Sequence, residues 1–445
     1  MFTGMIMPDS TIVTNVRTLN NQDYKTLALS ALGGALEFYD FIIFVFFSIT
    51  ISHLFFPDDM PAWLSQVQTF GIFAAGYLIR PFGGIVMAHF GDMFGRKRMF
   101  TLSILLMALP TLFIGCLPTY ANIGIFAPLL LLMMRLCQGL AVGGEVPGAW
   151  TFVAEHVPKN KIGLACGILT SGLSLGILLG SLVSTIMSKS VSIEQMNDWG
   201  WRIPFIIGGI FGLIAMYLRR WLKETPIFLE IQKRKNEELS KKLPVITVLT
   251  QYLPQTILSM LLTWVLSAGI MVIMLMTPIL LQKQFGFLAL EALQGNILAI
   301  IGLIISCTFY GMMMDKFSMG KVLVIGCSIA AIMIAIFYLS LENANLLFIT
   351  YFLAGSSVGI VGSFAYFMVK VFPTQVRYSG VSFSFNMAYA IAGGLTPLLI
   401  SFFSDFVSKM APAIYVVGLF VLGALIGLFL LVNNNSQKYV AKDIA

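Results

Sequence analysis

Five ionisable side chains lie inside apolar stretches of the sequence that otherwise carry almost no charge. They are three acids and two arginines: Glu37, Asp40, Arg80, Arg135 and Glu145. Burial favours the neutral form of a carboxyl group, whereas a nearby guanidinium favours its ionised form. A carboxyl group held between these influences can take up and release a proton, and a guanidinium can bind a carboxylate through two parallel hydrogen bonds. The chemistry to be expected is proton exchange and anion binding.

The segments that hold these residues have the composition of membrane helices. The chain has 445 residues, of which 58% are hydrophobic and 11% charged, whereas a soluble domain has roughly 25% charged residues. At about 1.5 Å of rise per residue, Glu37, Arg80 and Arg135 fall near the middle of a ~30 Å hydrocarbon layer. A charge at that depth is costly unless it faces a partner or a wet cavity. Each is therefore either a member of a functional site or half of a buried acid–arginine pair that fixes helix packing.

The sequence predicts an all-α polytopic membrane protein with twelve transmembrane helices. The expected spans are 27–52, 65–90, 99–118, 123–154, 162–187, 201–222, 252–283, 290–314, 321–341, 345–372, 378–404 and 411–432. A charged segment divides them into two sets of six. The expected organisation is a tail (1–26), an N-terminal six-helix bundle (27–222), a linker (223–244), a C-terminal six-helix bundle (245–432) and a second tail (433–445).

The placement of lysine and arginine predicts the orientation. Basic residues outside the spans gather on the side of both chain ends, and the other side has only Lys189, Arg202, Lys283 and Lys409. Basic loops stay in the cytoplasm, so both termini are expected there. This topology accounts for the net charge of +7 without a nucleic-acid partner. The polar first 26 residues lack the apolar stretch of a cleavable signal peptide.

The two halves also look duplicated. The segment 88–100 after span 2 has a counterpart in 311–323 after span 8, and Pro158 after span 4 corresponds to Pro373 after span 10. Both pairs are separated by nearly half the chain. Internal repeats of this kind place the binding site at the interface between the halves, near the middle of the membrane.

These segments resemble the major facilitator superfamily and, within it, the bacterial metabolite:proton symporters, which include carriers of proline and betaine, citrate, α-ketoglutarate and shikimate. The motifs that carry the resemblance are GDMFGRKR (91–98), EFYDF (37–41), RPFGG (80–84), RLCQG (135–139), GGE (143–145), WGWRIPF (199–205), KETPIF (223–228), FPTQVRYSG (372–380) and FNMAYAIAGG (385–394). The resemblance implies two pseudo-symmetric six-helix bundles, alternating access, a bacterial inner (cytoplasmic) membrane location and a monomer.

Proton coupling is expected to rest on the N-terminal bundle. Glu37 is the expected proton carrier, Asp40 assists it, and Arg135 modulates its protonation. Glu37 and Asp40 share one helix face because they are three residues apart. A proton gradient is then the only energy source required, and no cofactor is expected.

Substrate binding is expected from both halves. Arg80 is the candidate anchor for a substrate carboxylate, and the resemblance places Trp264, Asn386 and Tyr389 in the helices that border the cavity. An aromatic wall beside an arginine suits a zwitterion, because a ring face attracts an ammonium group. We expect symport of a small carboxylate-bearing metabolite, either a proline- or betaine-like zwitterion or an organic acid.

A further set of charged residues is expected to gate the pathway. It consists of Asp92, Arg96, Lys97, Glu145, Glu155, Asp315, Lys370 and Arg377. The resemblance makes the loop around Asp92 a cytoplasmic lock. We expect Arg96 to pair with Glu155, and Asp315 to pair directly with Lys370. The alternative is a basic cluster that only sets the topology.

Other classes of function remain open or are disfavoured. Proton-driven export of a metabolite or drug is the nearest alternative, and a non-transporting receptor or scaffold is less favoured because it needs no buried charge. An enzyme or ATP-driven pump is not expected, since the sequence has no G-x-x-x-x-G-K-[ST] phosphate loop. The five cysteines are scattered singly without metal-ligand spacing, so no metal site is expected.

Overall fold

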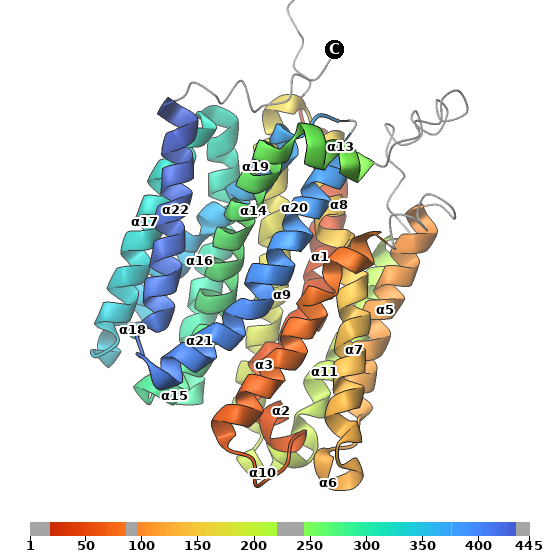
Figure 1. Cartoon of the computed structure of the whole chain (residues 1–445), viewed down its shortest axis with the longest axis vertical. Helices are drawn as coiled ribbons and strands as arrows, with labels where there is room; N and C mark the ends of the chain where they lie inside the picture. The colour runs from red at the N-terminus through yellow and green to blue at the C-terminus, as the bar shows by residue number, and fades with distance from the viewer. Residues whose placement is uncertain (1–17, 86–95, 220–243, 375, 433–445) are drawn as a thin grey trace, which may run out of the picture.

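In the computed structural model, long helices run side by side along the longest axis of the molecule (Figure 1). The structure describes residues 18–85, 96–219, 244–374 and 376–432, and these ranges contain helices and turns but no strand. A helix satisfies its backbone hydrogen bonds internally, which lipid requires of a spanning segment. The expected all-helical polytopic fold is confirmed.

The first half contributes six spans. The first three are α1 (Asn21–Phe46) with α2 (Ser48–Leu54), α3 (Ala62–Leu78) followed by helical residues 80–85, and α5 (Arg96–Cys116). The next three are α7 (Phe126–Val142) with α8 (Glu145–His156), α9 (Ile162–Ser190) and α11 (Arg202–Arg219). Short connecting elements are α6 (Tyr120–Ile123), η1 (Lys159–Lys161), α10 (Ile193–Gln195) and η2 (Met196–Gly200).

The second half contributes the other six. After α13 (Pro244–Gln251) come α14 (Leu253–Ala268) with η3 (Gly269–Met276) and α15 (Thr277–Phe285), then α16 (Ala289–Lys316) and α17 (Met319–Ser340). After η4 (Ala344–Leu346), span 10 consists of α18 (Leu347–Val358), η5 (Gly359–Val361) and α19 (Gly362–Val371). Span 11 consists of α20 (Arg377–Ala388), η6 (Tyr389–Gly393) and α21 (Gly394–Phe406). Span 12 is α22 (Ala411–Val432).

The first helix begins earlier than the apolar run alone predicts. Asn20 accepts a hydrogen bond from the backbone N–H of Asp23 at 2.8 Å, and the Asp23 carboxylate accepts one from the Asn20 N–H at 2.9 Å. This reciprocal capping box satisfies two N–H groups that a helix start leaves without partners. The helix therefore starts at Asn21 instead of residue 27. The described residues exclude 223–243 of the expected linker (223–244), as well as the two ends of the chain.

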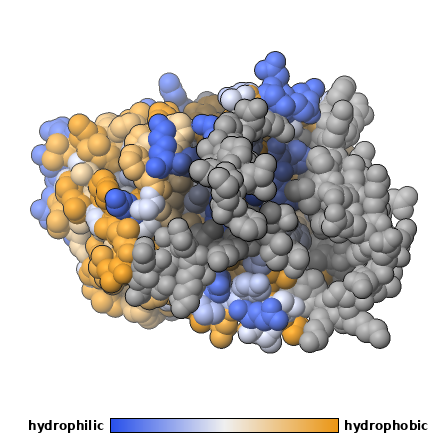
Figure 2. All heavy atoms as spheres, turned by 90° about the horizontal axis from the view of Figure 1, so that it is seen from above, coloured by the Kyte–Doolittle hydropathy of each residue, from blue (hydrophilic) through white to orange (hydrophobic). Residues whose placement is uncertain are grey.

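The outer surface carries the apolar side chains that lipid requires. On α17 the exposed residues recur every three or four positions: Ile325, Ile329, Ile332, Ile336 and Leu339. The end view shows the corresponding apolar flank on the side of the second half (Figure 2). Within the described ranges, nine helices are long and apolar enough to cross a membrane, or ten if one bent pair counts as a span. The chain is a multi-pass membrane protein.

The two ends of the bundle differ in charge. We call the end with Lys161, Lys316, Lys321 and Lys370 the basic end; it is the end at which α22 finishes, at the top of Figure 1. The opposite end holds α2, α6, α10 and α15.

The halves pack most closely along α9 and α16. A Cβ atom at Gly163 would overlap the Gly311 carbonyl oxygen, and one at Gly167 would lie 2.8 Å from the Cys307 carbonyl oxygen. Small residues four apart let membrane helices approach this closely. The two helices therefore form a tight seam near the basic end.

Helix interruptions mark the inner face of the bundle. Spans 1 and 4 break at Phe47 and at Gly143–Gly144, and span 10 contains the 3₁₀ turn η5. Spans 7 and 11 contain the π-helical segments η3 and η6. Discontinuous helices and π segments recur at transporter and other functional sites. Of these, η3, η5 and η6 contribute side chains to the cavity described next.

Candidate functional site

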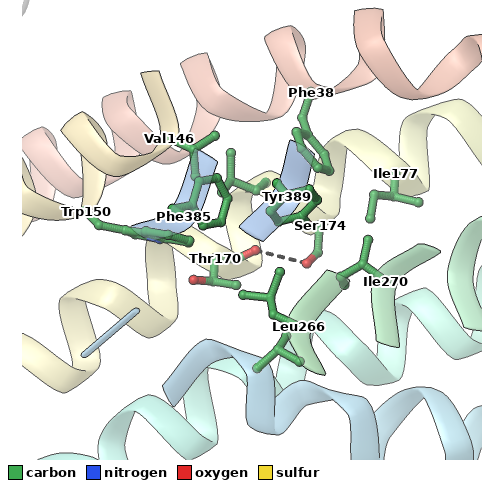
Figure 3. Close-up of a pocket in the computed structure, with 12 residues that line it drawn as sticks. Phe38, Val146, Trp150, Thr170, Ser174, Ile177, Leu266, Ile270, Phe385 and Tyr389 are labelled. Atoms are coloured by element: carbon green, nitrogen blue, oxygen red, sulfur yellow. Dashed lines mark hydrogen bonds between the residues drawn. The ribbon is translucent and has the colours of Figure 1, made fainter. Parts of the chain in front are cut away.

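A small cavity lies where the two halves meet. It is lined by side chains from α1, α8, α9, α14, η3, η5, α20 and η6, and Figure 3 shows most of them pointing towards one another. Its volume is about 30 Å³, which holds about two water molecules. The cavity is too small for proline or glycine betaine, so a substrate of that size requires the halves to move apart.

The cavity wall is mainly apolar and aromatic. Trp150 and Phe385 meet edge to face at 5.0 Å between ring centroids, and Phe385 contacts Tyr389 at 4.7 Å. The polar contribution comes from the hydroxyl groups of Thr170 and Ser174, and the Ser174 hydroxyl donates to the Thr170 carbonyl oxygen at 2.9 Å (Figure 3). The buried Trp150 Nε1 has no hydrogen-bond partner in the described part of the chain.

Arg80 lies at the interface inside a set of aromatic rings that we call the aromatic box: Phe41, Tyr77, Phe385 and Tyr389. The Arg80 Cζ atom is 4.9 Å from the ring centroid of Tyr77, 5.1 Å from that of Tyr389, and 5.8 Å from those of Phe41 and Phe385. The side chain is 2% exposed, and its Nε has no hydrogen-bond partner among the described residues. Its guanidinium is therefore held largely by cation–π attraction.

Arg135 occupies a separate place within the first half. Its NH1 group donates to the Gln138 side-chain oxygen at 2.7 Å and to the Phe41 carbonyl oxygen at 3.3 Å. Gln138 donates in turn to the Thr111 hydroxyl at 2.7 Å. The Arg135 Cζ lies 4.2 to 5.0 Å from three phenylalanine centroids, including Phe41. Its partners are thus a carbonyl, an amide and rings, in place of the acid expected from the sequence.

Asp40 points towards α11. A Cβ atom at Gly208 would lie 2.7 Å from its Oδ1, and one at Gly212 would lie 3.0 Å from its Oδ2. Both oxygens are buried without a hydrogen-bond partner in the described ranges. Glu37 is also buried on α1, one residue before Phe38, which lines the cavity. The structure places both acids in the expected helix, and their role in proton coupling stays a prediction.

The three residues chosen in the second half have different surroundings. Tyr389 lines the cavity and the aromatic box. Trp264 is 39% exposed, does not line the cavity, and donates through Nε1 to the Tyr415 hydroxyl at 2.8 Å. Asn386 donates to the Gly143 carbonyl oxygen and so joins span 11 to the break in span 4. The structure therefore brings only Tyr389 to the cavity.

The basic end is closed by contacts between the halves. Next to the Gly143 carbonyl group that Asn386 contacts, the Gly144 carbonyl oxygen accepts a hydrogen bond from the Tyr378 hydroxyl at 3.2 Å. Arg377 lies 3.7 Å from the Glu155 carboxylate. Two expected gate residues, Arg377 and Glu155, thus meet each other. The expected partner of Glu155 was Arg96, whose side chain, like Lys97 and Asp92, lies outside the described residues.

Asp315 closes the same end in an unexpected way. Its two carboxylate oxygens accept the backbone N–H groups of Gly163 at 2.7 Å and Leu164 at 2.8 Å, at the start of α9 in the other half. Lys161 and Lys370 lie near enough to attract its charge. The prediction of a direct Asp315–Lys370 ion pair is wrong, because the helix start offers two free N–H donors and a positive dipole end.

Contacts also close the opposite end. The rings of Trp63 in span 2 and Phe406 in span 11 meet edge to face at 5.4 Å. The Lys283 amino group in span 7 donates to the Gln66 side-chain oxygen at 3.3 Å. The sequence analysis did not select these residues. Among the described residues, the two halves thus contact each other at both ends of the molecule.

The aromatic box includes residues that sequence reasoning also missed. Tyr77 is three residues before Arg80, so the helical spacing that places such residues on one face could have pointed to it. Phe385 is the first residue of the motif FNMAYAIAGG (385–394), from which Asn386 and Tyr389 were the predicted substrate-binding residues. Phe41 lies next to Asp40.

Glu145 is buried at the start of α8, close enough to interact electrostatically with Arg80 and Asp40. In the described ranges, no three His, Cys, Asp or Glu side chains are placed to hold a metal ion.

Comparison with known proteins agrees with this architecture. The family model of the Major Facilitator Superfamily matches residues 30–397, which is most of the chain. The chain belongs to the major facilitator superfamily. The solved structure of the proton:xylose symporter XylE shares this fold, with a TM-score of 0.74 and 16% sequence identity over 92% of this chain and 95% of that one.

Curated relatives narrow the position within the superfamily. The chain is 34% identical to the inner membrane metabolite transport protein YhjE of Escherichia coli K12, covering 85% of this chain and 87% of that protein. It is 32% identical to the proline/betaine transporter of Salmonella typhimurium, over 91% of this chain and 82% of that protein. The expected membership in the metabolite:proton symporter group is confirmed, and this major facilitator protein is a transporter, not an enzyme.

Proposed function

We propose that the chain is a secondary active transporter that imports a small carboxylate-bearing metabolite together with protons. The substrate class comprises proline- or betaine-like zwitterions and organic acids. The basic end faces the cytoplasm of a bacterial cell, in accordance with the positive-inside rule, and both termini lie on that side of the inner membrane. The relatives named as proline/betaine transporters support this substrate class.

The observation that carries the proposal is the environment of Arg80. Its guanidinium is buried between the two halves, beside the cavity, with an Nε that lacks a hydrogen-bond partner among the described residues. Glu145 lies near enough to attract this charge, and a hydrogen-bonded anion would further offset the cost of a cation buried at this depth. A substrate carboxylate would supply charge-assisted hydrogen bonds, and the substrate would then contact both halves at once.

The acids of α1 support proton coupling. Asp40 is buried and both of its oxygens lack hydrogen-bond donors in the described ranges. An ionised carboxylate is costly in such surroundings, so a proton that binds in one conformation can be released when the helices rearrange. Glu37 is the proposed carrier and Asp40 its assistant.

The test is the pH inside proteoliposomes after addition of proline, glycine betaine, α-ketoglutarate, citrate or shikimate to the outside. We expect acidification by at least one compound. Glu37→Gln should abolish it, whereas Glu194→Gln, an acid exposed at the opposite end, should not. Alkalinisation by a compound would indicate an exporter that exchanges it for protons. Normal uphill uptake by Glu37→Gln would contradict the proposed carrier, and silence with every compound would contradict the substrate class.

A further inference from the structure

The aromatic box already contains a cation that belongs to the protein. Four ring centroids surround the Arg80 Cζ at 4.9 to 5.8 Å, within the ~6 Å over which a ring face attracts a cation. Such a set of rings is suited to a cation that has few hydrogen bonds to make. A guanidinium has five N–H donors, and ring faces are poor acceptors for them. The buried Nε of Arg80 lacks a hydrogen-bond partner among the described residues.

The box is assembled from both halves of the transporter. Phe41 and Tyr77 come from α1 and α3, whereas Phe385 and Tyr389 come from α20 and η6. The rings of Tyr77 and Tyr389 stack across the interface at 5.6 Å between centroids. The four rings therefore surround a cation only when the halves are together at this depth.

The box and the cavity share a wall. Phe385 and Tyr389 contribute to both, so a molecule that enlarges the cavity from the side of these rings meets the box. Figure 3 shows the two rings side by side at the cavity, opposite Leu266 and near Ser174. A ligand in the enlarged cavity would then contact Arg80 and the rings together.

From these contacts, and on the basis of the proposed function, we propose that Arg80 is a resident occupant of a quaternary-ammonium site. When a zwitterion binds, its methylated ammonium group takes the aromatic box, and the displaced Arg80 guanidinium pairs with the carboxylate of the same molecule. The protein's own cation keeps the box filled when no substrate is bound, and it becomes the anion site when the substrate enters.

This exchange selects among the substrates named above. The polar wall of the cavity consists mainly of the hydroxyls of Thr170 and Ser174, so it offers few hydrogen-bond acceptors. A trimethylammonium group has no N–H donor and therefore needs none. A primary ammonium would leave donors unsatisfied, at a cost. A dicarboxylate has no cation for the box, and Arg135 is engaged with Gln138 and Phe41. We therefore expect betaines to bind best, then proline, then dicarboxylates.

The test measures binding to the full-length protein in lipid nanodiscs by titration calorimetry. The first series is glycine, sarcosine, dimethylglycine and glycine betaine, in which the carboxylate is constant and only the methylation changes. Affinity should increase along the series, by about tenfold overall for a cation–π contribution of ordinary size. Tyr389→Leu should remove this increase. Tyr24→Leu, which changes an exposed tyrosine, should retain it.

The second probe is tetramethylammonium, a cation without a carboxylate. Arg80→Gln should weaken glycine betaine binding by about tenfold or more but strengthen tetramethylammonium binding, because it empties the box. These opposite changes separate displacement from a loss of folding, which would weaken both. Equal affinity for glycine and glycine betaine would overturn the proposal, as would unchanged or weaker tetramethylammonium binding to Arg80→Gln.

The outcomes also separate this inference from the proposed function. If α-ketoglutarate or citrate binds and acidifies the vesicles while the methylated series does not bind, the ammonium site is wrong and carboxylate symport stands. If no compound in either series binds or moves protons, both proposals fail.

Discussion

Asp315 in the second half accepts the backbone N–H of Gly163 in the first half at 2.7 Å. The contact joins the end of α16 to the start of α9 at the basic end. It combines a charge-assisted hydrogen bond with the positive end of a helix dipole. An inward-open state must separate these two helices, so this contact stabilises the closed basic end.

Removal of the Asp315 charge should favour opening at the basic end. In Asp315→Asn, a neutral amide with one oxygen acceptor replaces the carboxylate that accepts the N–H groups of Gly163 and Leu164. We expect the state that is open at the basic end to be populated about tenfold more. Cys166 can report this opening, because its side chain is fully buried. It is three residues after Gly163 and therefore lies on the same face of α9. Its labelling by N-ethylmaleimide, measured by mass spectrometry, should accelerate by a similar factor.

The control for this experiment is Glu342→Gln, which removes an exposed acid at the opposite end. Unchanged Cys166 labelling in Asp315→Asn would show that the cap does not hold the end closed. The charge-reversed double variant Asp315→Lys with Lys370→Glu should not recover transport, because lysine cannot accept the two backbone hydrogen bonds.

The α9–α16 seam should not tolerate a larger residue. Gly163→Ala introduces a methyl group where the Gly311 carbonyl oxygen already lies, and overpacking costs about 1–3 kcal/mol. We expect substrate uptake to fall at least about fivefold, since the basic end can no longer close. Gly71→Ala is the matched control, because its added methyl group meets no atom within 4 Å. Equal uptake by the two variants would exclude the seam as a closing surface.

The opposite end should lock when Trp63 and Phe406 are linked. Their rings meet at 5.4 Å between centroids, and both side chains are partly exposed to reagents. In Trp63→Cys with Phe406→Cys, on a Cys116→Ser background, a short bifunctional methanethiosulfonate should stop transport by at least about 90%, and dithiothreitol should restore it. Each single cysteine variant should keep its activity. Continued transport after complete cross-linking would show that this end does not open during the cycle.

Asp40→Asn should fold at least as well as the original chain. The Asp40 carboxyl is buried against Gly208 and Gly212, with no donor to either oxygen among the described residues. A neutral amide of the same shape is less costly there if the acid is ionised in the resting state. We expect the melting temperature in nanodiscs to be equal or a few degrees higher. Asp198→Asn, at an exposed position, should leave it unchanged, and a fall of several degrees for Asp40→Asn alone would indicate a structural partner.

Much of this protein could be predicted from local sequence, because lipid imposes a rule on every segment that crosses it. A spanning helix must be long, apolar and internally hydrogen-bonded, so the spans were visible as apolar runs. For the same reason Glu37, Asp40, Arg80 and Arg135 stood out against their surroundings. The superfamily was also recognisable, because its motifs are short continuous segments such as 91–98 and 372–380.

The partners of those residues were decided only by the tertiary structure. Successive residues project about 100° apart around a helix, so a small error in rotation sends a side chain to a different neighbour. Asp40 therefore faces α11, and Trp264 lies away from the cavity. The aromatic box needs rings far apart in sequence, and Asp315 meets a backbone helix start that no side-chain pattern reveals. Such contacts depend on how the two halves pack, which no single segment determines.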